Sequence, residues 1–164
     1  MKLWRRFGFL RSEVSPKHET FSQTLGRVID LWKRLGSAPR SGVALASIAA
    51  FEEQHGVSLP PQMRQYFLAV DGMEEDYPVN DISRAIYFWP LAHIKPADEE
   101  EGFSQYARCY LFADYLLWSH AYAICLGQDG FGEIVVVGGS TLRKVARSFE
   151  EFLAKYLDSP QDLL

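Results

Sequence analysis

Hydrophobic residues recur at every third or fourth position along residues 21–35, a spacing that is typical of an amphipathic helix. Gly36 follows directly and is a common stop signal for a helix. Residues 37–42 are rich in Ser, Pro and Gly, and we expect them to form a linker. We interpret residues 1–18 as a loose or partly docked arm that precedes the first helix.

Two further helices are predicted before any strand. The first covers residues 43–55 and ends at Gly56, which favours a left-handed cap. Residues 59–61 then form a sharp Pro-containing corner, and a third helix continues to residue 70 before Asp71-Gly72 ends it. The apolar stripe of the helix over 43–55 consists of Leu45, Ile48, Ala49 and Phe51.

The pattern changes to that of strands beyond residue 85. The central runs are apolar on both faces, as expected for strands inside a sheet, and the Gly-rich segment 127–132 predicts a hairpin. The expected strands are residues 86–89, 91–94, 109–113, 121–126, 133–137 and 144–146.

A capping box starts the last helix. The Ser148 hydroxyl is placed to accept from the Glu151 amide, and the Glu151 carboxylate to reach back to the Ser148 amide. Phe149, Phe152 and Leu153 would then face the sheet. Helices followed by strands and a closing helix predict an α+β fold with a mostly antiparallel central sheet, on which the helices pack.

The composition excludes several classes of protein. With 164 residues the chain suits one domain, and 48% hydrophobic residues exclude intrinsic disorder. A net charge of −4 argues against direct nucleic-acid binding. No run approaches the roughly 20 apolar residues of a membrane span, and the basic start lacks a signal-peptide core. We therefore expect a cytoplasmic protein that does not bind a membrane.

The two cysteines, Cys109 and Cys125, lie inside apolar runs and match no zinc or redox spacing. We expect free, buried thiols in a reducing cytoplasm. A disulfide across neighbouring strands is the alternative.

Catalytic and metal-binding patterns give no positive signal. The four histidines are scattered, and neither an HExxH nor a GxSxG motif occurs. Gly138-Gly139-Ser140 lacks the lysine of a phosphate loop and fits a turn. We therefore expect no catalytic activity, no metal and no cofactor.

Charge is distributed unevenly along the chain. Residues 1–40 contain nine Lys or Arg against three acidic residues, whereas residues 71–101 contain nine acidic residues against two basic ones. The acidic side chains are either a solvated surface or a docking surface for a basic protein partner, such as a nuclease toxin. Those expected to bind a partner are Asp71, Glu74, Glu75, Asp76, Asp98, Glu99, Glu100 and Glu101.

Trp118 is the candidate for an aromatic anchor at such an interface. It precedes the polar Ser119-His120, which suits an exposed strand end, and Trp is frequent among residues that dominate binding energy. We expect most other aromatic residues of this half of the chain to lie in the core.

Three groups of residues, in this order, resemble the SUKH superfamily in its Smi/Knr (cell-wall assembly regulator) branch. The resembling segments are Ile48–Glu52 with Gly56–Pro60 and Phe67–Gly72, then Phe112–Trp118 with Tyr122–Ile124, and last Val145–Leu153. Asp71 stands where the family pattern often has Asn.

The resemblance implies a SUKH-like domain over residues 43–157, with a basic arm and extra helix over 1–42 and a tail over 158–164. It also implies that a set of motif residues is structural, namely Glu52, Gly56, Leu59, Pro60, Gly72, Ser148, Phe149, Phe152 and Leu153. Many bacterial members of the family resemble or act as immunity proteins that neutralise toxin domains of polymorphic or contact-dependent systems, and fungal members act as regulators of cell-wall synthesis and signalling. The expected function is toxin neutralisation by protein binding. The alternatives are a regulatory or scaffolding module of the same fold and a small enzyme or ligand-binding domain.

Overall fold

The computed structural model describes residues 19–74, 81–138 and 143–164. Its α-helices are α1 (Phe21–Arg34), α2 (Leu45–His55), α3 (Pro61–Ala69) and α4 (Phe149–Asp158). Its strands are β1 (Pro39–Ser41), β2 (Val70–Met73), β3 (Ile86–Phe88), β4 (Lys95–Pro96), β5 (Cys109–Tyr115), β6 (His120–Cys125), β7 (Ile134–Val137) and β8 (Arg143–Ala146). Short 3₁₀ helices are η1 (Ile82–Arg84), η2 (Leu91–His93), η3 (Ala97–Glu99), η4 (Ser104–Tyr106) and η5 (Pro160–Asp162). None of the helices in these ranges has both the length and the apolar character needed to cross a membrane.

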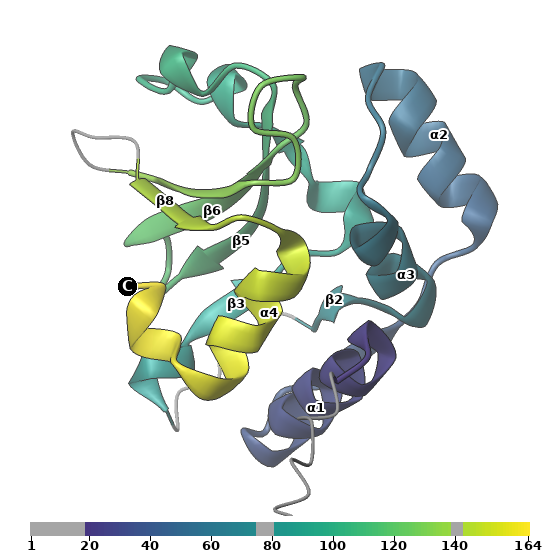
Figure 1. Ribbon diagram of the computed structural model, residues 1–164, viewed down its shortest axis with the longest axis vertical. Helices are drawn as coiled ribbons and strands as arrows, with labels where there is room; N and C mark the ends of the chain where they lie inside the picture. Colours follow the sequence, from purple (N-terminus) through teal and green to yellow (C-terminus); the bar gives the residue numbers. More distant parts are fainter. Residues whose placement is uncertain (1–18, 75–80, 139–142) are drawn as a thin grey trace, which may run out of the picture.

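The larger sheet has the strand order β3-β5-β6-β7-β8, and β4 pairs with β5 beside β3. Every pairing in it is antiparallel. The long strands β5 and β6 lie at its centre, while α1, α3 and α4 gather on one side of it (Figure 1). The predicted α+β fold with a mostly antiparallel sheet is confirmed.

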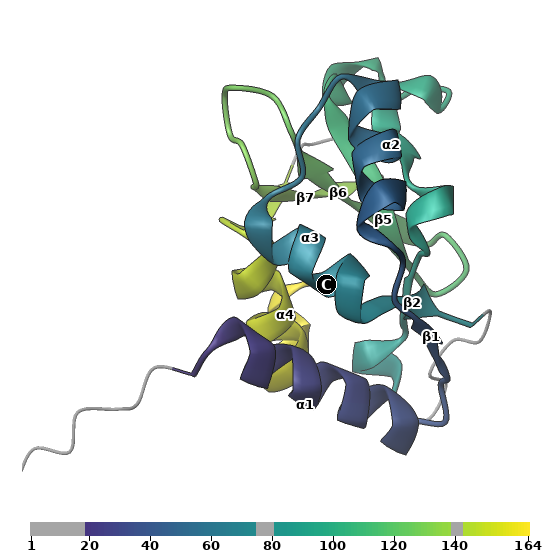
Figure 2. The same ribbon diagram turned by 90° about the vertical axis from the view of Figure 1, so that its right-hand side faces the viewer.

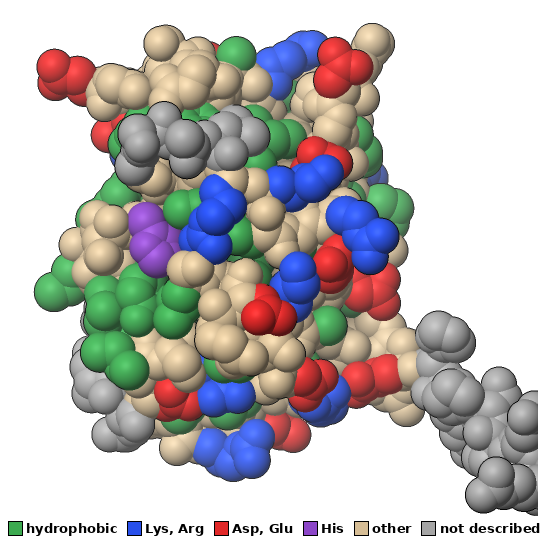
Figure 3. Space-filling view, turned by 60° about the vertical axis from the view of Figure 1, so that its left-hand side comes forward, with side chains coloured by type: hydrophobic (Ala, Val, Ile, Leu, Met, Phe, Trp, Pro, Cys, Tyr) green, Lys and Arg blue, Asp and Glu red, His purple; other side chains and the backbone are tan. Residues whose placement is uncertain are grey.

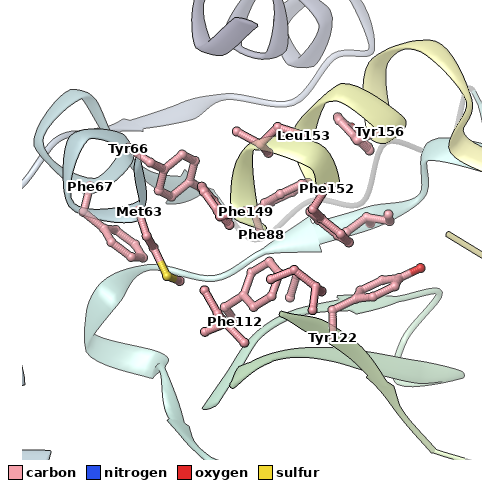
Figure 4. Packing of buried hydrophobic residues seen from close by; sticks show 14 of the residues in the cluster. Met63, Tyr66, Phe67, Phe88, Phe112, Tyr122, Phe149, Phe152, Leu153 and Tyr156 are labelled. Carbon is pink, nitrogen blue, oxygen red and sulfur yellow. The ribbon is translucent and has the colours of Figure 1, made fainter. Parts of the chain in front are cut away.

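The main core lies between this sheet and α4 (Figure 4). The Phe152 ring lies with its centroid 5.1 Å from Tyr122, 5.3 Å from Phe112 and 6.0 Å from Phe88. Phe149 lies 5.7 Å from Phe112 on the same face. Edge-to-face pairs of this kind add to the free energy gained from burying apolar area.

The opposite face of the sheet carries a second, smaller apolar cluster, which includes Leu111, Ala123 and Val135. The segment that contains η3 and η4 contributes Ala97 and Tyr106 to this cluster. Because both faces of the central strands are buried, their sequences are apolar at successive positions rather than alternating.

The first helix belongs to the main core. Val28 and Trp32 of α1 are fully buried, and the Trp32 ring lies 5.1 Å from that of Phe88. Arg27 also links α1 to α4 through an ion pair with Asp158 at 2.6 Å. Figure 2 shows α1 running past α4 along one side of the domain. The extra helix is therefore packed against the elements that follow it.

The predicted linker over residues 37–42 is partly a strand. Its central residues form β1, which pairs with β2 in a small antiparallel sheet. Gly42, directly after β1, passes close to the backbone at Leu68. A Cβ at Gly42 would lie 2.1 Å from the carbonyl oxygen of Leu68. The linker prediction was wrong because strand pairing depends on a partner about 30 residues away.

Gly72 has a different role from the one predicted. The helix α3 ends at Ala69, and Gly72 lies inside β2 with φ +71°. A Cβ at this position would lie 2.5 Å from the carbonyl oxygen of Phe88. Gly72 therefore does not end the helix but permits β2 to pass close to the backbone after β3.

The helix α2 ends where it was predicted to end, but only part of its predicted apolar stripe is buried. Gly56 adopts the left-handed conformation at φ 62°, as expected. Ile48 and Phe51 are buried, whereas Ala49 is exposed and Leu45 keeps 61% of its surface exposed. The helix thus leaves apolar surface outside the core.

The start of α4 confirms the predicted Ser148 cap, since its hydroxyl accepts from the Glu151 amide at 3.1 Å. The reciprocal bond differs from the prediction, because the Glu151 carboxylate accepts from the Arg147 amide at 2.9 Å instead of the Ser148 amide. This bond is the main reason why the pKa of Glu151 is lowered.

The expectation of free thiols was wrong. Cys109 and Cys125 are directly opposite each other in the β5–β6 pair and form a disulfide, with a Cα–Cα distance of 4.0 Å. The Leu126 amide donates to the Arg108 carbonyl, which makes the cysteines a non-hydrogen-bonded pair, where strands approach most closely. Sequence spacing alone does not reveal this register.

Candidate functional site

The acidic residues expected to bind a partner form two segments, a first over 71–76 and a second over 98–101. The second acidic segment follows β4 and lies at the surface. Asp98, Glu99 and Glu101 are exposed, and Glu100 forms an ion pair with Lys95. Burial is the main reason why the pKa of Tyr110 is raised, and the negative charge of Asp98 raises it further. The charge of the acidic segment therefore acts on Tyr110 in β5, next to β4.

Trp118 lies in the turn between β5 and β6. Three consecutive residues of this turn, Leu116, Leu117 and Trp118, have positive φ angles of 44°, 52° and 68°. Positive φ angles are unfavourable for residues other than glycine. Clusters of residues in such strained conformations are frequent at binding sites. The turn exposes 79% of Leu117 and 47% of Trp118. It therefore presents two large apolar side chains to solvent.

Asp114 holds this turn in place. Its carboxylate accepts from the Trp118 amide at 3.2 Å and from the Trp89 indole N–H at 2.7 Å. Asp114 is only 1% exposed, and the Trp89 ring lies tilted against that of Trp118 with ring centroids 5.1 Å apart. Our sequence reasoning missed this residue, although a lone carboxylate inside the apolar strand at 109–115 was a usable signal.

Lys95 connects the acidic segment to the aromatic turn. Its ammonium pairs with Glu100 and lies 5.7 Å from the ring centroid of Trp118. Such a cation over an aromatic face is attracted by the ring quadrupole. The structure therefore brings the predicted anchor and the second acidic segment together on one surface, which we call the Lys95 surface (residues 95–101 and 116–118).

The first acidic segment contributes less than expected. The Asp71 carboxylate accepts from the Leu91 amide at 2.7 Å, so at least one of its oxygens holds the fold together. Glu74 is exposed. Glu75 and Asp76 lie outside the described residues.

A groove of about 630 Å³ lies between α2 and the chain from η2 to η3. Both acidic segments reach it, because Asp71 and Glu99 are among its lining residues. Its walls are mostly apolar and include Ala50 and Phe51 of α2, opposite Ile94. The groove and the Lys95 surface share Lys95, Pro96 and Glu99.

The face around β8 has a different character. In Figure 3, which turns the β8 side of the domain forward, acidic and basic side chains are interspersed among hydrophobic ones. Arg143 and Lys144 of β8 are exposed. Neither acidic nor basic side chains thus form a patch of a single sign on this face.

The chain was compared with models of known protein families, and the model of the SMI1 / KNR4 family (SUKH-1) matches residues 42–155. This match covers more than half of the chain. The chain belongs to the SMI1 / KNR4 family. No curated protein matches the chain significantly.

The matched region includes the corner that the family resemblance identified. The Glu52 carboxylate accepts from the Leu59 amide at 2.7 Å and from Arg64 at 2.6 and 2.9 Å. Leu59 and Pro60 are buried beneath it. Glu52 therefore fixes the turn between α2 and α3 of this SMI1 / KNR4 domain, a structural role.

The described histidines lie in separate places. His55 packs against Phe51 and Tyr110, and His120 stacks on Tyr115 with ring centroids 4.9 Å apart. Burial, followed by the positive charge of Arg143, lowers the pKa of His120. Within residues 19–74, 81–138 and 143–164, no group of three or more His, Cys, Asp or Glu side chains is placed to hold a metal.

Proposed function

We propose that this SMI1 / KNR4-family chain is a non-catalytic protein-binding domain that acts as an immunity protein. It binds a basic toxin domain through the Lys95 surface and blocks that toxin. The observation that carries the proposal is the position of Lys95, which joins Glu100 to the exposed Trp118. One surface thereby combines carboxylates with an aromatic anchor, the two features that a tight complex with a basic protein needs.

The two features have separate roles in the proposal. A toxin that acts on nucleic acid carries positive charge, and the exposed Asp98, Glu99 and Glu101 would steer it toward this surface. Trp118 would then enter a pocket on the toxin and slow dissociation. Because Asp114 holds the Trp118 turn, the anchor is already in place before binding.

The test is a binding experiment with the product of the neighbouring gene, which should be a toxin domain that co-purifies with this chain if the proposal holds. Reversing Glu99 and Glu101 to Lys should slow association about tenfold at low salt, with little change in dissociation. The control reverses the exposed Asp129 and Asp162, which changes the net charge equally. The effect of the first pair should shrink as salt rises.

Trp118→Ala should instead raise the dissociation rate at every salt concentration. A matched variant, Phe131→Ala, removes an aromatic side chain that is 48% exposed elsewhere and should leave binding unchanged. If neither the charge reversal nor Trp118→Ala changes binding or protection from the toxin, the Lys95 surface is not the interface. Binding without protection would favour the scaffolding alternative.

A further inference from the structure

The groove beside α2 offers more apolar surface than the domain itself uses. The first two turns of α2 contain no charged residue, and Ala50, which lines the groove, remains exposed there. Across the groove, Leu91 and Ile94 supply an apolar wall. The teal segment that carries this wall runs alongside α2 in Figure 2. An apolar hollow of this size on a domain surface is a typical site for the side chains of a bound segment.

The groove has a carboxylate at each end, and its one lining lysine, Lys95, forms an ion pair with Glu100. Asp71 lies at the end of the groove near the start of α2, where its carboxylate accepts a hydrogen bond from the Leu91 amide. Glu99 lies near the last turn of α2, where the His55 ring packs against Tyr110. A segment that fits the groove would therefore combine apolar side chains along its length with basic side chains toward its ends.

The chain contains such a segment, within residues 1–18, which precede the described residues. Residues 1–18 have five basic residues against the single acidic Glu13. The apolar and basic side chains are interleaved, with Leu3, Trp4, Phe7, Phe9 and Leu10 among Lys2, Arg5, Arg6 and Arg11. The part between Arg11 and Glu19, residues 12–18, reaches at most about 27 Å when fully extended, and a domain of this size has a radius of gyration of about 15 Å. The groove of the same chain is therefore within reach.

We infer that residues 3–11 bind in the groove between α2 and the η2–η3 segment of their own chain. The aromatic side chains pack against Phe51 and Ile94, and the arginines approach Asp71 and Glu99. Attachment to the same chain raises the effective concentration of the segment, so a weak contact is sufficient. The segment would then cover Glu99, a residue that we assign to partner binding, and compete with the partner. The inference itself requires no partner and stands independently of the proposed function.

Cleavage of the full-length chain by trypsin after Arg5, Arg6 and Arg11 measures whether the groove is occupied. A synthetic peptide of residues 1–18, isotopically labelled and present in the same reaction, reports the rate for the unbound sequence. At low salt the full-length chain should be cut about fivefold more slowly than the peptide, because cleavage follows the population of the open form. Intact-mass spectrometry separates the products.

Two variants of α2 distinguish binding from steric hindrance by the nearby domain. Ala50→Trp fills the groove and should raise the cleavage rate to that of the peptide. Ala49→Trp places the same side chain on the next exposed position, which does not line the groove, and should keep the slow rate. Equal rates for the two variants would overturn the inference.

A second pair of variants tests the charge. Glu99→Lys should speed cleavage, whereas Glu53→Lys, which changes an exposed residue of α2 outside the groove lining, should not. Higher salt should reduce the difference. Protection that increases with protein concentration would mean that a second copy supplies the segment, and would overturn the intramolecular inference.

Discussion

The buried carboxylate of Asp114 accepts a hydrogen bond from the backbone amide of Trp118 at 3.2 Å. The same carboxylate also accepts from the indole of Trp89, so one acidic side chain positions both tryptophans. A carboxylate this deeply buried requires hydrogen-bond donors to offset the loss of water. The strained turn and its anchor therefore depend on a residue that is not itself at the surface.

Asp114→Ala should lower the free energy of unfolding by about 3 kcal/mol, because hydrogen bonds to a charged group are lost and a buried donor is left unsatisfied. Chemical denaturation measures this loss. The near-ultraviolet circular dichroism of the tryptophans should change as well. Asp98→Ala, at an exposed position, serves as the control and should stay within about 0.5 kcal/mol of the wild type. A neutral Asp114→Ala would contradict the positioning role.

Ser148→Ala should lower the free energy of unfolding by about 1 kcal/mol, because the Glu151 amide loses its capping acceptor. Ser148→Asp retains an acceptor at the same position and should restore most of the loss. Denaturant midpoints of the three proteins provide the comparison. Equal midpoints for the Ala and Asp variants would show that the cap contributes nothing.

Phe152→Ala should lower the free energy of unfolding by about 3–5 kcal/mol, more than Ser148→Ala, because removal of the fully buried ring leaves a cavity between α4 and the sheet. Phe152→Leu fills part of the space and should cost less. Both values come from the same denaturation experiment. If Phe152→Ala were as stable as the wild type, the packing in Figure 4 would be wrong.

The disulfide predicts that the protein, purified in air and then unfolded, has no reactive thiol, and that it has two after reduction. Reduction should also lower the free energy of unfolding by about 3 kcal/mol, since the bond closes a loop over a sequence separation of 16. The double variant Cys109→Ser/Cys125→Ser should not respond to reductant. Two reactive thiols in the unreduced protein would contradict the bond and agree with the reducing compartment expected from the sequence.

The lowered pKa of His120 predicts how stability changes with pH. The folded protein binds a proton at His120 less readily than the unfolded chain does. The contribution of His120 to the free energy of unfolding is therefore fully present above the pKa of the unfolded chain, which is about 6.5. It is lost as the pH falls below that value toward the folded pKa. His120→Gln should therefore flatten the fall in unfolding free energy between about pH 7 and pH 5. His93→Gln, at an exposed position, should leave the slope unchanged.

The sequence alone determined the features that depend on neighbours a few residues away. The periodic apolar positions identified the helices, Gly56 ended α2 as expected, and Ser148 capped α4. These signals are reliable because a helix closes its hydrogen bonds within four residues, so the pattern and the caps are local. The order of helices and strands then sufficed for the α+β class.

Tertiary structure decided the features that join residues far apart along the chain. The register of β5 and β6 brought Cys109 opposite Cys125, and the approach of β2 to the end of β3 required Gly72. The acidic residues and Trp118 were predicted from the sequence as partner-binding residues, but the contacts of Lys95 with Glu100 and Trp118 were not. Strand register, close backbone approach and surface neighbours are set by how the whole core packs, because each depends on partners that sequence distance does not specify.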